Sequence, residues 1–224
     1  MKVCDILEAA VDDQSDKRVP EFATRVATMK SNDPAHRFVG SGTNAYVHSR
    51  DDPHDMDRVY RTAKRADGGS IYLRYIATHP NLHNNPYFPR VVQAPSNHRE
   101  AFPTYQIEPL KDFYWKPIAN NPVLCDAVYE RIYGPRDEAD DDAFTMLDRH
   151  LAEDMDNCIY SGIITKRFKD TSLVEALTII HQLARRYRLS GDVHTGNIMW
   201  RLTSTMPQLV ITDPLWDNTR GGRS

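Results

Sequence analysis

The stretch SGDVHTGNIMWRLTSTMPQLVITD, residues 190–213, holds the most informative residues of the chain. Asp192 is followed five residues later by Asn197, and Asp213 comes sixteen residues after Asn197. The apolar run Leu209-Val210-Ile211 leads into Asp213 and has the composition of a buried strand. An Asp-x4-Asn spacing on a tight loop brings both side chains to one face, and the strand that follows returns Asp213 to the same place.

These residue types are the ones that phosphoryl transfer needs. One carboxylate orients a hydroxyl group, while an amide oxygen and a second carboxylate hold magnesium on the phosphates. We therefore predict that Asp192 is catalytic and that Asn197 and Asp213 bind Mg²⁺. The alternative interpretation is an ordinary polar turn between a helix and a strand.

The pattern GDVHTGN, followed by ITD at the end of a strand, resembles the catalytic core of the protein-kinase-like superfamily. The G-D-x-H-x-G-N form is similar to that of aminoglycoside phosphotransferases. With VGSGTNAYVHS upstream and ITDP downstream, residues 37–216 most resemble the early host-takeover Ser/Thr protein kinases of short-tailed bacteriophages. This resemblance implies an α+β, two-lobed fold, with a small antiparallel-sheet N-lobe and a reduced, mostly helical C-lobe. It also implies ATP and Mg²⁺ as cofactors.

Composition narrows the class of protein. A length of 224 residues suits one domain or one small two-lobed unit. A net charge of −3 argues against nucleic-acid binding driven by overall charge. No apolar run has the length of a membrane span, and the start MKVCDILEAAVDDQ lacks the apolar centre of a signal peptide. Three widely spaced cysteines fit a reducing compartment, so we expect a cytoplasmic protein, in the host cytoplasm if a phage encodes it.

The predicted organisation is a helical extension over 1–35, an N-lobe over 36–108 and a C-lobe over 109–224. In the N-lobe, a glycine turn lets backbone amides approach phosphate oxygens, and we predict this role for Gly40, Ser41, Gly42 and Thr43. A common glycine hairpin is the alternative, because the motif alone is weak.

A basic residue for the α- and β-phosphates is expected on the next strand. Arg61 and Lys64 are the candidates, and their odd offset points them to opposite faces of a strand, so only one can serve. Both could also be solvated strand-end charges. Residues 70–78 are predicted as a helix with Ser70 as N-cap. The resemblance places here a glutamate that orients the lysine, but between residues 61 and 98 the only acidic residue is Asp67.

A strand over 103–107 is predicted to lead into a link between the lobes. The backbone of roughly 107–110, including Glu108 and Leu110, would meet the edge of adenine; an ordinary strand end is the equal alternative. Downstream, the segment 135–156 is rich in acidic residues and is predicted to be a helix with a solvated face, or else a partner-binding surface over 137–156. Residues 171–188 are predicted as a long amphipathic helix that enters the Asp192 loop.

Three functions remain open from the sequence. The first is an ATP-dependent protein Ser/Thr kinase that phosphorylates host proteins, transcription machinery among them, without binding nucleic acid or membrane directly. The second is a pseudokinase that binds and inhibits a host protein, favoured by Arg61 in the lysine position and by the absent glutamate. The third is a small-molecule phosphotransferase, suggested by the Gly-Asp-x-His form.

Overall fold

The structure is a computed structural model of the whole chain. It describes residues 36–41, 45–50, 59–63, 67–93, 104–136, 141–164, 167–204 and 206–217. The predicted extension over 1–35 lies outside these residues, as do Gly42, Thr43 and Lys64. Two compact units make up the chain, one of residues 1–66 and 92–107 and the other of residues 67–91 and 108–224. None of the described helices is both long enough and apolar enough to cross a bilayer.

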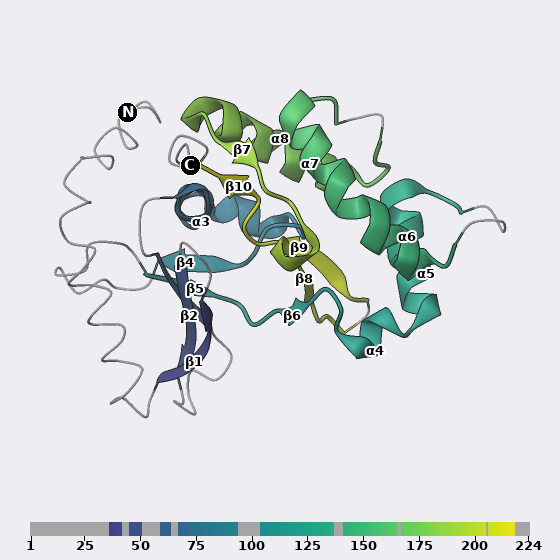
Figure 1. Cartoon of the computed structure of the whole chain (residues 1–224), viewed down its shortest axis with the longest axis horizontal. Coiled ribbons are helices and arrows are strands. Elements are labelled where there is room, and N and C mark those ends of the chain that lie inside the picture. Colours follow the sequence, from purple (N-terminus) through teal and green to yellow (C-terminus); the bar gives the residue numbers. More distant parts are fainter. Residues whose placement is uncertain are drawn as a thin grey trace, which may run out of the picture. The chain divides into compact units, whose positions relative to one another are not determined.

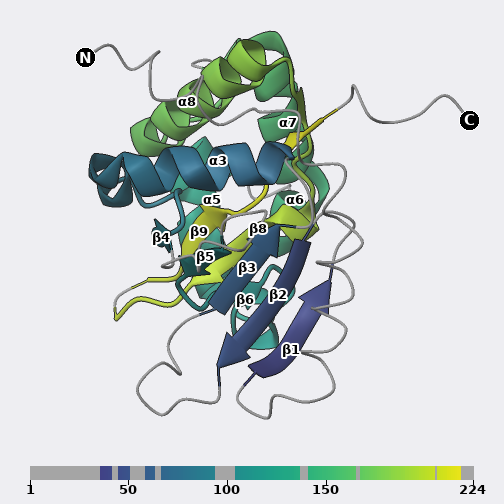
Figure 2. The same cartoon turned by 90° about the vertical axis from the view of Figure 1, so that its left-hand side faces the viewer.

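The first unit is built on an antiparallel sheet. In the part of the chain that the structure describes, this sheet has five strands in the order β1-β2-β3-β5-β4. Their bounds are His36–Ser41 for β1, Ala45–Arg50 for β2, Val59–Ala63 for β3, Val91–Gln93 for β4 and Thr104–Ile107 for β5. Figure 2 shows β1, β2 and β3 side by side. Cross-strand pairs tie β3 to β5, with Thr62 Oγ1 3.0 Å from Thr104 Oγ1 and Gln106 Nε2 donating to Tyr60 at 3.0 Å.

Helix α3, Gly68–Thr78, opens the second unit. Asp67 caps it by accepting the Ser70 amide at 2.7 Å, so Ser70 lies inside the first turn and its prediction as the N-cap was wrong. Tyr72, Leu73 and Ile76 form its buried face. Helix α3 packs against strand β10 (Leu215–Trp216) and against the 3₁₀ turn Pro80–Asn84. Residues 67–91 belong to the second unit, whereas the predicted N-lobe of 36–108 placed them with the sheet.

Two small antiparallel sheets support the C-terminal half of the second unit. The first has the order β6-β8-β9, with bounds Lys111–Asp112, Ile198–Arg201 and Gln208–Ile211. The second pairs β7, Ser190–Gly191, with β10, Leu215–Trp216. Strand β9 is buried at all four positions, as the apolar run before Asp213 predicted.

Helices make up the rest of the second unit (Figure 1). They are α4 (Lys116–Ala119), α5 (Pro122–Tyr133), α6 (Ala143–Met146), a π-helical turn (Leu147–Leu151), α7 (Ala152–Ser161) and α8 (Thr171–Tyr187). Asp170 caps α8, and the apolar residues of its predicted inward face are buried: Leu173, Ala176, Leu177, Ile180 and Leu183. The long amphipathic helix predicted before the Asp192 loop is therefore confirmed, and α7 packs along it.

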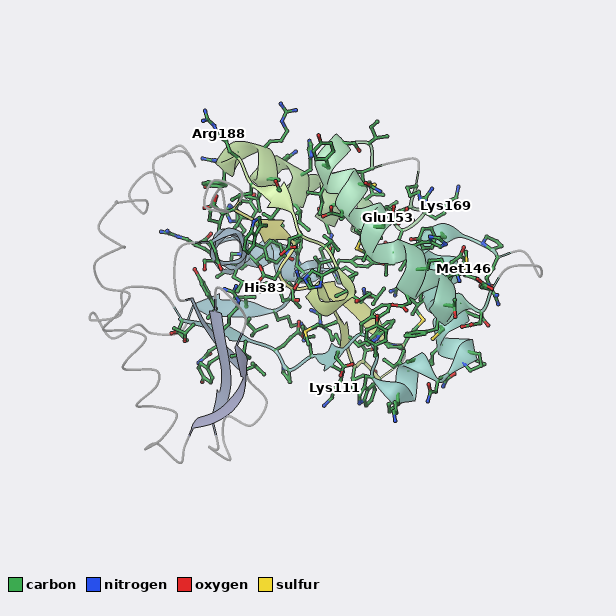
Figure 3. The ribbon with its side chains drawn as sticks, viewed as in Figure 1. His83, Lys111, Met146, Glu153, Lys169 and Arg188 are labelled. Atoms are coloured by element: carbon green, nitrogen blue, oxygen red, sulfur yellow. The ribbon has the colours of Figure 1, made fainter. Side chains whose placement is uncertain are left out.

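The acidic segment does not form one solvated helix face. Residues 137–140 lie outside the described residues, and α7 buries part of its charge. Glu153 is exposed and is seen on α7 in Figure 3, but Asp154 is 8% exposed, where it pairs with Arg167 at 2.6 Å and accepts the Tyr133 hydroxyl at 2.9 Å. Together these helices and antiparallel sheets confirm the predicted α+β class.

Candidate active site

The Asp192 loop begins where α8 ends. Arg188 closes the helix in the left-handed conformation (φ 55°), and the Leu189 amide donates to Ala184 O at 2.8 Å. Strand β7 follows, then Asp192, and then a 3₁₀ turn over Thr195–Asn197. The helix end therefore sets where the loop starts.

The residues before and after Asp213 are hydrogen-bonded to this loop. The first, Thr212, donates through its amide to Asn197 O at 2.9 Å and through its hydroxyl to the same oxygen at 3.1 Å. The second, Pro214, accepts the Asp192 amide at 2.9 Å. The residues flanking Asp213 are thus bonded to Asp192 and Asn197, and the three predicted site residues are brought together.

The amide of Asn197 has a fixed orientation. Its Nδ2 donates to the backbone oxygen of Asp192 at 2.7 Å, and only the nitrogen end of an amide can bond a carbonyl oxygen. Oδ1 is therefore the end turned away from that bond, and an amide oxygen is a type of ligand that magnesium accepts.

Asp192 is half-buried, and its electrostatics suit a base. Burial raises the pKa of its carboxyl, the positive charge of His194 opposes this rise, and the carboxylate of Asp156 adds to it. A carboxylate with a raised pKa holds an accepted proton more readily than an ordinary surface aspartate does.

Asp156 is a site residue that the sequence interpretation missed. Its Oδ1 accepts the Val193 amide at 3.1 Å, and a Cβ on Gly191 would overlap the same oxygen. Asp156 therefore packs against the residues on both sides of Asp192. Gly191 was the available signal, since a glycine beside a catalytic residue often marks a close approach of another group.

An exposed tyrosine lies beside the loop. The hydroxyl of Tyr114 donates to Asp148 Oδ1 at 2.7 Å and lies 3.3 Å from Thr195 Oγ1. Tyr114 is 52% exposed, and its ring packs edge-on against Phe113. The loop is thus flanked by an aromatic ring and a carboxylate that solvent can reach.

Glu108, predicted to contribute its backbone to an adenine contact, is bonded within the second unit. Its amide donates to Arg90 O at 3.1 Å, and its carboxylate accepts the Arg90 amide at 2.8 Å. The same carboxylate binds Arg201 through Nε at 2.7 Å and through Nη2. Arg201 also donates to Pro86 O and Phe88 O, at 2.9 and 2.8 Å. Both the amide and the carboxylate of Glu108 are therefore already hydrogen-bonded to other residues of the second unit. Leu110, two residues further on, is half-buried.

The remaining predicted residues belong to the first unit. Gly40 and Ser41 end β1, opposite Val47 and Tyr46 of β2. Arg61 is buried in β3, opposite Val47 on one side and Tyr105 on the other. Their assignment to phosphate contacts stays a prediction.

The side-chain oxygens near the Asp192 loop are of the types that bind an Mg²⁺ ion together with phosphate oxygens. No group of three or more His, Cys, Asp or Glu suited to a metal ion occurs in the described ranges. An amide oxygen from Asn197 and a carboxylate from Asp213 are hard oxygen donors, and Mg²⁺ in kinase sites takes one or two such ligands plus phosphate oxygens and water. These two residues fit that role.

Comparison with solved structures shows a distant likeness. No protein-family model and no curated protein sequence matches the chain. Among solved structures, the GDP and kanamycin complex of the aminoglycoside phosphotransferase APH(2")-IIia is similar, with a TM-score of 0.38 and 15% identity over 87% of this chain and 73% of that chain. At this identity the two chains share too few residues for an activity to be transferred from one to the other.

Proposed function

We propose that the chain is an ATP- and Mg²⁺-dependent phosphotransferase. One observation supports this most: Thr212 and Pro214, which flank Asp213, are bonded to the loop that bears Asp192 and Asn197. A base, an amide oxygen and a carboxylate thus share one place in the fold, and this is the set that phosphoryl transfer requires.

In the proposed reaction, Asp192 orients the acceptor hydroxyl and accepts its proton. A bond forms between the acceptor oxygen and the γ-phosphorus, the bond from that phosphorus to the β,γ-bridging oxygen breaks, and ADP leaves with the electron pair. Asn197 and Asp213 would hold Mg²⁺, which would supply positive charge to neutralise the phosphates. The raised pKa of Asp192 favours the proton transfer.

The segment 108–110 leaves one amide for adenine. The Glu108 amide is bonded to Arg90 O, and Pro109 has no N–H. We therefore assign the predicted adenine contact to the backbone of Leu110.

As acceptor we propose a Ser or Thr hydroxyl of a host protein, as the resemblance to phage kinases implies, with transcription machinery among the partners and the cytoplasm as the place of action. The test is to incubate a bacterial lysate with the chain, Mg²⁺ and γ-labelled ATP. The wild type should label protein, and Asp192→Ala and Asp213→Ala should lower labelling by about a hundredfold or more. Glu153→Gln removes an exposed carboxylate of α7 and should label as the wild type does. Equal labelling by all four chains would refute the proposal.

A pseudokinase is the second candidate, favoured by one feature of α3. This helix has no acidic residue from Gly68 to Thr78, so it offers no carboxylate to orient a phosphate-binding cation. ATP with Mg²⁺ should then raise the melting temperature, as ligand linkage requires, while no labelled product forms. A stoichiometric host protein retained equally by the wild type and Asp192→Ala would support this function.

A small-molecule phosphotransferase is the third candidate. The exposed Tyr114 and Asp148 beside Thr195 offer an aromatic face and a negative charge to a soluble acceptor. ATP consumption that depends on an added amino sugar, and not on added protein, would favour this function over the first.

A further inference from the structure

Helix α3 is bonded to the strand that precedes Asp213. Tyr72 is fully buried, and its hydroxyl donates to Ile211 O at 2.7 Å. Asp213 lies near enough to add to the rise that burial causes in the pKa of Tyr72, so this hydroxyl stays protonated and remains a donor.

A second contact ties the start of α3 to the residues after Asp213. Gly68 lies directly against the backbone of Leu215, where a Cβ would overlap the carbonyl oxygen. Tyr72 and Gly68 are four positions apart and so face the same side of the helix. Helix α3 thus contacts the chain two residues before Asp213 and two residues after it.

The same segment is also bonded to the catalytic loop. The amides of Thr212 and Asp192 form the bonds to Asn197 O and Pro214 O, at 2.9 Å each. Ile211 is fixed further by its own amide, which donates to Tyr87 O at 2.9 Å. The backbone from Ile211 to Leu215 is therefore held between α3 and the loop.

We propose that α3 is a positioning element for magnesium, and that Tyr72 is its key residue. The helix has no acidic side chain with which to act on a cation. Instead, Tyr72 and Gly68 fix the backbone on both sides of Asp213 and so set where its carboxylate meets the metal. This inference rests on the proposed function for the identity of the metal, but not for the fixing of the backbone.

The test compares Tyr72→Phe with a matched control, Tyr87→Phe. Both tyrosines are fully buried in the second unit, and each substitution removes one hydroxyl hydrogen bond. The hydroxyl of Tyr87 bonds Asp170 at the start of α8, so its loss lowers stability. The bond from the Ile211 amide is to the backbone oxygen of Tyr87, which the substitution keeps, and Ile211 O is not affected. A purely structural role for Tyr72 predicts the same behaviour from both variants.

Two readouts are measured. Calorimetric titration of MgCl₂ into the chain saturated with a non-hydrolysable ATP analogue gives the Kd for Mg²⁺, which should rise about tenfold in Tyr72→Phe and stay unchanged in Tyr87→Phe. Hydrogen exchange, which needs no ligand, should show faster exchange of the Thr212 and Asp192 amides in Tyr72→Phe only.

A third variant checks the Gly68 contact. Alanine is a better helix former than glycine, so Gly68→Ala does not weaken α3 itself. Any loss of Mg²⁺ affinity or amide protection in this variant therefore comes from the overlap of the new Cβ with Leu215. Its Mg²⁺ Kd should rise, and the same two amides should exchange faster.

The outcomes separate the inference from the proposed function. If the wild type binds Mg²⁺ with the analogue and Tyr72→Phe matches Tyr87→Phe in both readouts, the inference is overturned. If the wild type binds neither Mg²⁺ nor the ATP analogue, the proposed function fails and hydrogen exchange alone decides the inference. Faster exchange in Tyr72→Phe but not in Tyr87→Phe supports the inference. Equal exchange in the two variants overturns it.

Discussion

Replacing Arg201 with methionine should destabilise the second unit strongly. The side chains of Arg201 and Glu108 are 10% and 12% exposed, so the substitution leaves a buried carboxylate without its cation. Removing one partner of a buried pair costs about 3–5 kcal/mol. The carbonyls of Pro86 and Phe88 also lose their donors, at about 1 kcal/mol each. A total of about 5–7 kcal/mol corresponds to a fall in melting temperature of about 10–28 °C for a chain of this size.

The assay is thermal and urea unfolding followed by circular dichroism, with Arg149→Ala as control. Arg149 pairs with Asp141 at 2.7 Å, but both side chains are more than half exposed, so its loss should cost less than about 1 kcal/mol. The double variant Arg201→Met with Glu108→Leu removes the uncompensated charge, and it should be more stable than Arg201→Met alone. If Arg201→Met is as mild as Arg149→Ala, or if adding Glu108→Leu lowers stability further, the argument from the buried charge is wrong.

Three further predictions concern the loop and α8. Gly191→Ala places a Cβ on Asp156, so kcat should fall at least tenfold and stability by about 1–3 kcal/mol, measured by kinetics and urea unfolding. Burial and Asp156 raise the pKa of Asp192. In the pH profile of kcat/KM, the midpoint of the acid limb should therefore lie above the ordinary aspartate pKa of about 3.9. Asp156→Asn should move this limb to lower pH, and a move to higher pH would contradict the assignment. Asp170→Ala removes the cap of α8 and should cost about 2–4 kcal/mol in thermal unfolding, with Asp170→Asn losing less.

Local patterns in the sequence predicted that Asp192, Asn197 and Asp213 would be brought together, as the backbone bonds of the residues flanking Asp213 show, while their chemical roles stay predictions. Asp192 and Asn197 are close along the chain. The apolar run before Asp213 is typical of a buried strand, and one such strand with one turn is enough to bring Asp213 back to the loop that bears the other two residues. The spacing of Leu173, Leu177 and Ile180 predicted α8 for the same reason, since helical periodicity needs no knowledge of distant contacts.

The groups that hold the site depend on contacts that no local pattern shows. Asp156 reaches Val193 across 37 residues, Arg201 reaches Glu108 across 93, and Tyr72 reaches Ile211 across 139. A charged residue in an acidic run is usually solvated, and only the packing of α7 against β7 shows otherwise for Asp156.

The start of α3 was misplaced for a related reason. Serine is a preferred N-cap residue, which favoured a helix beginning at Ser70. In the structure, Gly68 lies in the first turn of α3, where the absence of a Cβ allows the close approach to Leu215. The helix therefore begins before Ser70, and Asp67 is its N-cap.

The π-helical turn Leu147–Leu151 carries about one residue more than an α-helical turn, so a one-residue deletion there can be absorbed by its becoming α-helical and leaves α7 in place. Each α-helical residue adds about 100° of rotation, so one residue inserted between this turn and α7 would rotate α7 by about that angle relative to α6. Asp156 would then leave Gly191, and Asp154 would leave Tyr133. Descendants of this sequence can therefore vary at an exposed position such as Glu153, but an insertion between the π-helical turn and Asp156 would need a second, compensating change in length.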